Sequence, residues 1–221
     1  MNAALDPAAR LVLRGLLSAI LGWAAWHKLR DVGAFRAAVE AYELAPPLWA
    51  VPIGAALIAA ELAIAVGLWL PRVGSAAAMA AAALLLLYGT AIAINLARGR
   101  RDLDCGCAGP AGELPISSAL VARNLVLAAL AAASALPGAA RPWHWLDAVT
   151  VAAGVIALAA LYAVVDGLLA NTPALRRLRA LDVELRRDDS TVRPLVASPV
   201  RANAPGGGIF DVASRPEGGN A

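Results

Sequence analysis

The chain has 221 residues, of which 60% are hydrophobic and 16% charged, with a mean hydropathy of +0.67 and a net charge of +3 at pH 7. Because soluble domains average roughly 45–50% apolar and 25% charged residues, this composition predicts a membrane protein. In such a protein the positive charge reports loop topology and contact with anionic membrane lipids, and we expect no nucleic acid among its partners.

Four apolar runs reach the roughly 20 residues that a bilayer core requires, and a fifth, nearest the N-terminus, is shorter. In chain order the five cover Leu11–Trp26, Leu48–Leu70, Val73–Leu96, Ile116–Leu136 and Trp145–Leu169. The first run can extend back to Ala8 if Arg14 reaches the headgroups. No small-x-small cleavage site precedes His27, which favours an uncleaved helix over a signal peptide. We therefore predict an all-α, polytopic membrane helical bundle of about five transmembrane helices.

The segments outside these runs divide the chain further. Val32, Phe35, Val39 and Tyr42 recur at helical spacing and predict a short amphipathic helix in the membrane interface, ended by two prolines. The longest internal loop joins the third and fourth membrane helices. Three regions are expected: a helical bundle over 1–170 with a redox loop at 98–117, an amphipathic surface helix over 171–187, and a disordered tail over 188–221.

Lysines and arginines beside the predicted helices are distributed unevenly between the two sides of the membrane. Eleven lie on the side of the long loop and four on the other: Lys28, Arg30, Arg36, Arg98, Arg100, Arg101, Arg176, Arg177, Arg179, Arg186 and Arg187, against Arg10, Arg14, Arg72 and Arg141. Because cytoplasmic loops carry the excess of such residues, we expect a cytoplasmic C-terminal tail and a long loop near the cytoplasmic face.

The long loop contains both cysteines of the chain, Cys105 and Cys107, on either side of Gly106. Residues i and i+2 reach the Cα separation of a disulfide, roughly 4.4–6.8 Å, only in a bend that glycine permits. So small a ring is expected to be strained and easily reduced, which favours thiol–disulfide exchange. A turn without chemistry is the alternative. We expect no metal, because two thiolates alone do not complete a tetrahedral site and His27 and His144 fall on opposite sides.

Charged and polar residues surround this loop. Arg98, Arg100 and Arg101 favour thiolate over thiol, whereas Asp102 and Asp104 oppose it. Three further residues lie where the flanking membrane helices meet the loop, and they either order it and stabilise a thiolate or simply anchor the helices at the interface: Asn95, Arg123 and Asn124.

Glu61 lies near the middle of the second membrane run, where an ionisable group costs at least a few kcal/mol. We therefore expect it to face the bundle interior with a partner, either as a packing residue or with a role in proton transfer. Lys28, after the first helix, is either a flanking cation that reaches the headgroups or part of a site.

Several stretches together resemble the MauE membrane proteins of methylamine utilisation, within the wider DoxX-like group of redox-associated membrane proteins. They are "HKLRD", "AYELAPP", "LWLPRVGS", "NLARGRRDLDCGCAG" and "ARN", within a region of about 11–169. The resemblance implies a four-helix DoxX-like core in a bacterial inner or plasma membrane. It also implies that Cys105 and Cys107 match the family's cysteine pair and that Glu61 matches the group's intramembrane acid.

The resemblance further implies that the chain supports thiol–disulfide redox chemistry and the maturation of a partner protein. In the family this partner is of the methylamine dehydrogenase type. A thioredoxin-like protein is implied as a second partner. A quinone is a possible cofactor. Two other functions remain open: a non-catalytic membrane scaffold or subunit, and a carrier that uses Glu61. The charge count conflicts with direct oxidation of a periplasmic client, because it assigns the cysteines to the cytoplasmic side.

Overall fold

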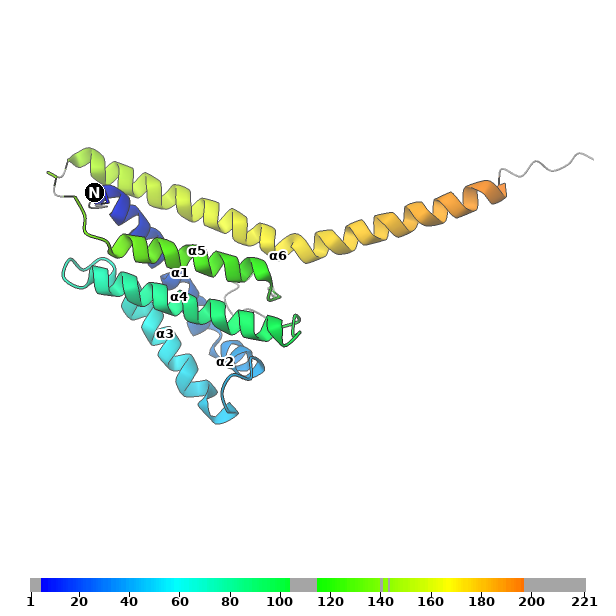
Figure 1. Cartoon of the computed structure of the whole chain (residues 1–221), viewed down its shortest axis with the longest axis horizontal. Coiled ribbons are helices and arrows are strands. Elements are labelled where there is room, and N and C mark those ends of the chain that lie inside the picture. The colour runs from blue at the N-terminus through cyan, green and yellow to red at the C-terminus, as the bar shows by residue number, and fades with distance from the viewer. Residues whose placement is uncertain (1–4, 104–114, 140, 143, 197–221) are drawn as a thin grey trace, which may run out of the picture. The chain divides into compact units, whose positions relative to one another are not determined.

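The computed structural model describes residues 5–103, 115–139, 141–142 and 144–196, and in the last helix it describes side chains only up to 169 and at 171 and 181–183. All named elements in these residues are helices (Figure 1). They are α1 (Pro7–Arg30), α2 (Val32–Ala41), the short 3₁₀ helix η1 (Pro47–Trp49), α3 (Ala50–Gly67), α4 (Gly74–Ala97), α5 (Ser118–Ala135) and α6 (Trp145–Val196).

Five helices in the described residues are long and apolar enough to cross a membrane. They are Pro7–Arg30, Pro47–Gly67, Gly74–Ala97, Ser118–Ala135 and Trp145–Leu169, which confirms the all-α membrane bundle predicted from hydropathy. The chain is therefore an integral membrane protein. The first helix is longer than its apolar run because Asp6 caps it, accepting a hydrogen bond from the Ala8 N–H at 2.8 Å, and Pro7 occupies its first turn.

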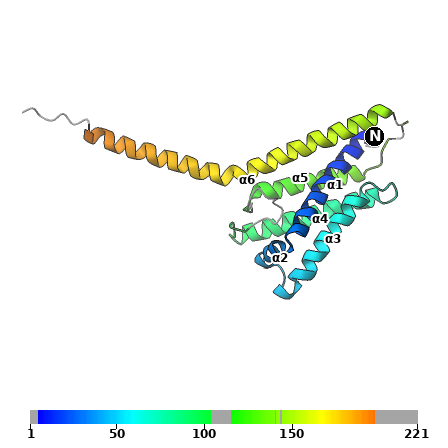
Figure 2. The ribbon, with the colours of Figure 1, turned by 180° about the vertical axis from the view of Figure 1, so that it is seen from behind.

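Small side chains pack the centre of the bundle. The helices α4 and α5 lie along each other, and α1 packs against α3 (Figures 1 and 2). Ala78, Ala81 and Ala131 are fully buried in the core cluster, beside Leu17 and Leu21 of α1. Alanines at these positions allow close approach of helix backbones, which is how helices associate where lipid removes the hydrophobic driving force.

The last helix is the least buried of the five candidate spans. Only 6% of its membrane window is buried, against 33–39% for the other four. The chain forms two compact units, 1–174 and 175–221, so the first unit contains the bundle and the α6 residues up to 174. The helical backbone of α6 continues to Val196. The division of this region into a surface helix and a tail stays a prediction.

A cluster of charges joins the start of α1 to the start of α6. Arg141 donates hydrogen bonds to Asp6 Oδ2 at 2.8 Å and to Asp147 Oδ1 at 2.6 Å. The guanidinium of Arg141, followed by the backbone N–H of Ala8, lowers the pKa of Asp6 to about 2. The carboxylates of Asp147 and Asp6 in turn raise the pKa of Arg141. The two chain segments are thus tied together by charge-assisted hydrogen bonds.

The prediction that Arg14 reaches the lipid headgroups is wrong. Its side chain does not reach out to headgroups but is buried, at 5% exposed. Its Nη2 donates to Ser75 Oγ at 3.0 Å and to the Ser134 carbonyl at 3.2 Å. A Cβ at Gly74 would lie 2.5 Å from Arg14 Nη1, so glycine at this position leaves room for the guanidinium. Protein groups on α4 and α5 therefore take the place of lipid headgroups.

Candidate functional site

Three polar side chains from three membrane helices meet inside the bundle. Lys28 of α1 forms an ion pair with Glu61 Oε1 of α3. The Tyr88 hydroxyl of α4 donates to the same oxygen at 2.7 Å and accepts from Lys28 Nζ at 3.3 Å. This trio, Lys28, Glu61 and Tyr88, connects helices that are far apart in the sequence.

The trio is buried: Lys28 is 3% exposed and Glu61 is 0% exposed. Isolated charges at such positions would be very costly, and pairing offsets much of that cost. Glu61 Oε2 is buried and has no hydrogen-bond partner among the described residues. Glu61 therefore directs one satisfied and one unsatisfied oxygen into the interior, an arrangement more typical of a site than of packing alone.

Aromatic rings complete the surroundings of the lysine. Lys28 Nζ lies 5.0 Å from the ring centre of Phe35 on α2 and 4.9 Å from that of Tyr88. A Cβ at Gly54 of α3 would lie 3.5 Å from the Phe35 ring, an ordinary van der Waals distance, so the ring lies close beside this part of α3. The ammonium is therefore stabilised by two ring faces as well as by the Glu61 carboxylate.

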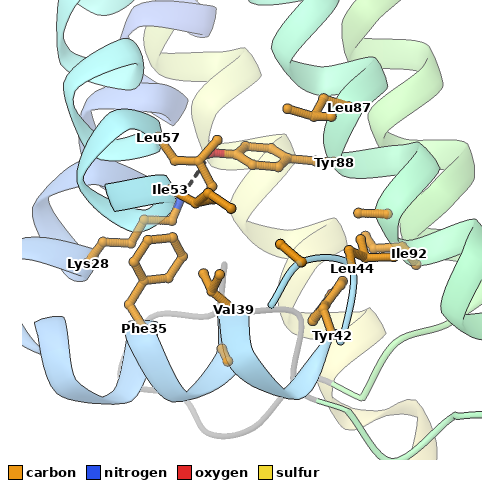
Figure 3. A pocket seen from close by; sticks show the side chains of 13 residues that line it. Lys28, Phe35, Val39, Tyr42, Leu44, Ile53, Leu57, Leu87, Tyr88 and Ile92 are labelled. Atoms are coloured by element: carbon orange, nitrogen blue, oxygen red, sulfur yellow. Dashed lines mark hydrogen bonds between the residues drawn. The ribbon is translucent and has the colours of Figure 1, made fainter. Parts of the chain in front are cut away.

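A cavity of about 250 Å³ adjoins the trio (Figure 3). Lys28, Tyr42 and Tyr88 are the lining residues with polar side-chain groups, and the remaining lining is apolar, from α2, the turn that follows it, α3 and α4. Figure 3 shows the lysine nitrogen and the tyrosine oxygen directed toward each other at one side, with Phe35 and Val39 below them. The lining consists of Lys28, Phe35, Ala38, Val39, Tyr42, Leu44, Ala45, Ile53, Leu57, Leu87, Tyr88, Ala91 and Ile92.

The start of the long loop is attached to the chain after α2. Arg100 Nη2 lies 2.9 Å from Glu43 Oε1 in an ion pair, and Arg98 Nη1 donates to the Glu43 carbonyl at 3.4 Å. Arg100 also donates to Oδ1 of the fully buried Asn95, at 3.4 Å. Glu43 has a φ of 48°, a left-handed conformation that residues other than glycine seldom adopt. Arg101 is exposed.

The two ends of the cysteine-bearing segment meet at a backbone hydrogen bond. The Ile116 N–H donates to the Leu103 carbonyl at 3.0 Å. Ile116 is buried in a cluster with Ile92 and Leu120, and Tyr42 and Leu103 pack against that cluster. Tyr42 and Ile92 also line the cavity, so the loop base and the cavity share side chains. Cys105 and Cys107 themselves, with the range 104–114, lie outside the described residues.

The polar residues at the start of α5 have different partners. Arg123 pairs with Asp166 of α6 and lies 5.8 Å from the ring centre of Tyr162. Asn124 is buried and donates to the carbonyl of Leu120 at 2.9 Å. The described contacts of Arg123 therefore join α5 to α6. Ser117 occupies the N-cap position of α5 but makes no capping hydrogen bond with its side chain.

The structure also identifies site residues that the sequence reasoning missed. Tyr88 gave no signal beyond being a polar group within an apolar run. Asp166 could have been found by the rule that singled out Glu61, because an acid within an apolar run needs a partner. Among the described residues, no group of three or more His, Cys, Asp and Glu side chains is arranged to hold a metal ion.

Comparisons with known proteins give a consistent result. The family described as "Methylamine utilisation protein MauE" matches residues 7–137. "Methylamine utilization protein MauE" of Paracoccus denitrificans is 42% identical over 137 residues, which are 61% of this chain and 74% of that protein. The protein of the same description from Methylophilus methylotrophus is 33% identical over 175 residues, 76% of this chain and 90% of that protein. No solved structure matches. The chain therefore belongs to the MauE family.

Proposed function

We propose that this chain serves methylamine utilisation, as the family description implies, as a thiol–disulfide redox protein of the bacterial inner membrane. The observation that carries the proposal is the anchored base of the cysteine-bearing segment. Leu103 and Ile116 close that base, and Arg100 fixes its start to Glu43. The family match over 7–137 extends across both cysteines. A pair of thiols held on a fixed base is suited to repeated exchange with a partner.

In the proposed reaction, Cys105 and Cys107 cycle between disulfide and dithiol. A thiolate of the client attacks one sulfur of the pair and forms a mixed disulfide. The client's second thiolate then attacks the client sulfur of the mixed disulfide and releases the cysteine of the pair. The client gains one disulfide, and the pair gains two electrons and is released as a dithiol after taking up two protons. A thioredoxin-like protein is the expected partner in the exchange.

The cations near the loop base support this role. Arg98 and Arg101 add positive potential that favours thiolates, whereas the charge of Arg100 is offset by its ion pair with Glu43. Arg123 is already paired with Asp166, so we assign it to helix packing in this proposal. Asn95 acts on the loop through Arg100, as a positioning residue.

The test uses the fact that the chain has only two cysteines. A Cys107→Ala variant in native membranes keeps the Cys105 thiol, which can attack a disulfide of an oxidised partner but has no second thiol to release it. It is expected to accumulate a mixed disulfide, seen as a band that reductant abolishes, and mass spectrometry identifies the attached protein. Cys105→Ala is the matched control, since only the cysteine that forms the mixed disulfide with the partner should trap it efficiently. Growth on methylamine with the double alanine variant at the wild-type rate would refute the proposal. A scaffold predicts that result, together with co-purification independent of the cysteines.

The side of the membrane is tested separately. A membrane-impermeant thiol reagent is added to intact cells before and after reduction, and it labels only reduced cysteines on the outer side. The charge distribution predicts no labelling until the cells are opened, and a cytoplasmic C-terminal tail. Labelling in intact cells would instead assign the pair to the periplasm, where a client could be oxidised directly.

A further inference from the structure

The cavity beside the trio has one hydrogen-bond donor to spare. The ammonium of Lys28 has three N–H groups, and its acceptors Glu61 Oε1 and Tyr88 Oη take two of them. The Tyr88 hydroxyl proton is directed to Glu61. A molecule in the cavity can therefore accept a hydrogen bond from Lys28 without breaking the trio. The polar end of this cavity is suited to a hydrogen-bond acceptor.

The charge of the trio restricts that acceptor to a neutral group. Lys28 and Glu61 form one ion pair in a buried setting. A carboxylate or phosphate would bring a second negative charge against a single cation, and the uncompensated charge would be costly to bury. A carbonyl oxygen accepts the N–H and adds no charge. Fatty acids and phosphate headgroups are therefore disfavoured.

The walls and mouth of the cavity indicate where the ligand comes from. Phe35 and Tyr42 supply aromatic rings, and Ile53 and Leu57 supply aliphatic surface. Leu44 and Leu87 line the cavity and are 44% and 55% exposed, so the cavity opens between apolar side chains. A volume of about 250 Å³ is slightly below the roughly 300 Å³ at which small-molecule sites begin and suits one ring-sized head group. Such a ligand enters from the bilayer.

We propose that this cavity binds the head group of a lipid-soluble quinone, with one carbonyl accepting from Lys28 and the ring between Phe35 and the α3–α4 wall. The inference deepens the proposed function and rests on it for the electron donor: the dithiol gives up two electrons and two protons, forming its S–S bond, and the quinone takes them up to become a quinol. Binding itself depends only on the cavity.

The binding test uses the full-length chain in nanodiscs of quinone-free phospholipid and a photoreactive azido-ubiquinone. Illumination followed by mass spectrometry is expected to map the label to peptides of α2, α3 and α4, and unlabelled ubiquinone should compete. Ala91→Phe fills the cavity and is expected to reduce labelling at least tenfold. The matched control, Ala93→Phe, adds the same ring at an exposed position of α4 and should label like the wild type.

Other outcomes separate this inference from the redox proposal. The Cys105→Ala, Cys107→Ala double variant should keep full labelling, because the cavity does not depend on the cysteines, even if the thiol chemistry proves wrong. Equal labelling of both phenylalanine variants would overturn the inference, provided that their thermal unfolding curves show both to be folded. Competition by fatty acid or phospholipid but not by ubiquinone would also overturn it, by showing a lipid site.

Discussion

Replacing Lys28 by methionine is expected to lower the free energy of unfolding by about 3–5 kcal/mol, the usual cost of removing one member of a buried ion pair. The magnitude follows from burial: Lys28 is 3% and Glu61 0% exposed, so water does not solvate the carboxylate left behind. Tyr88 keeps its hydrogen bond to Glu61 and compensates only in part.

The diagnostic variant removes both charges. With Lys28→Met and Glu61→Met together, no uncompensated charge remains, and the double variant should be more stable than Lys28→Met alone and close to the wild type. The assay is a denaturant titration in detergent micelles, followed by tryptophan fluorescence, with a double-mutant cycle built from the four proteins.

The exposed pair on α2 supplies the control. The side chains of Arg36 and Glu40 are 56% and 35% exposed, and Arg36 Nε lies 2.8 Å from Glu40 Oε1. Arg36→Met should change the free energy of unfolding by about 0.5 kcal/mol or less. Additive effects of the two substitutions in the buried pair would refute the reasoning, because additivity means that neither charge stabilises the other.

Two further predictions concern other parts of the bundle. Gly15→Ala on α1 should destabilise the protein by about 1–3 kcal/mol, because the new Cβ would lie 2.5 Å from the branched side chain of Val155. Gly22→Ala, whose new Cβ would meet nothing within 4 Å, should be neutral or stabilising in the same denaturant titration. Because the Arg141 guanidinium lowers the pKa of Asp6 from 3.8 to about 2, the contribution of Asp6 to stability is complete above about pH 4 and is lost as the pH falls through 2. Asp6→Asn should therefore show a smaller fall in unfolding temperature than the wild type between pH 5 and pH 2, and an equal fall would contradict this.

The fold was accessible from the sequence because lipid imposes a strong constraint on length and hydropathy. Each apolar run of about 20 residues became a helix, and the spacing of Val32, Phe35, Val39 and Tyr42 correctly predicted a helix, α2, although α2 ends at Ala41, before the two prolines expected to end it. Arg14 was predicted wrongly because hydropathy says nothing about acceptors on other helices. Ser75 and the Ser134 carbonyl are far away in the sequence and become its partners only through packing.

The site was accessible only in part. An acid in an apolar run must face inward, so Glu61 could be singled out, and Lys28 was noted as a cation near a helix end. That these two form a pair, with Tyr88 as the third member, depends on how α1, α3 and α4 are oriented about their axes. A single sequence carries no information on that orientation. The cavity is equally invisible, because it is a gap between side chains of separate elements.

Asp31 makes the junction of α1 and α2 a stiff corner. Its N–H donates to the His27 carbonyl, its carboxylate accepts from the Ala34 N–H at 2.8 Å, and its carbonyl accepts from the Phe35 N–H at 3.1 Å. One residue thus ends one helix and begins the next, so the Lys28 ammonium and the Phe35 ring belong to one continuous, hydrogen-bonded segment of chain. Any widening of the cavity must then come from α3, from α4 or from the turn after α2. Inserting one residue at this corner would rotate Phe35 by about 100° away from Lys28, so the spacing between the two is as much a part of the site as their side chains.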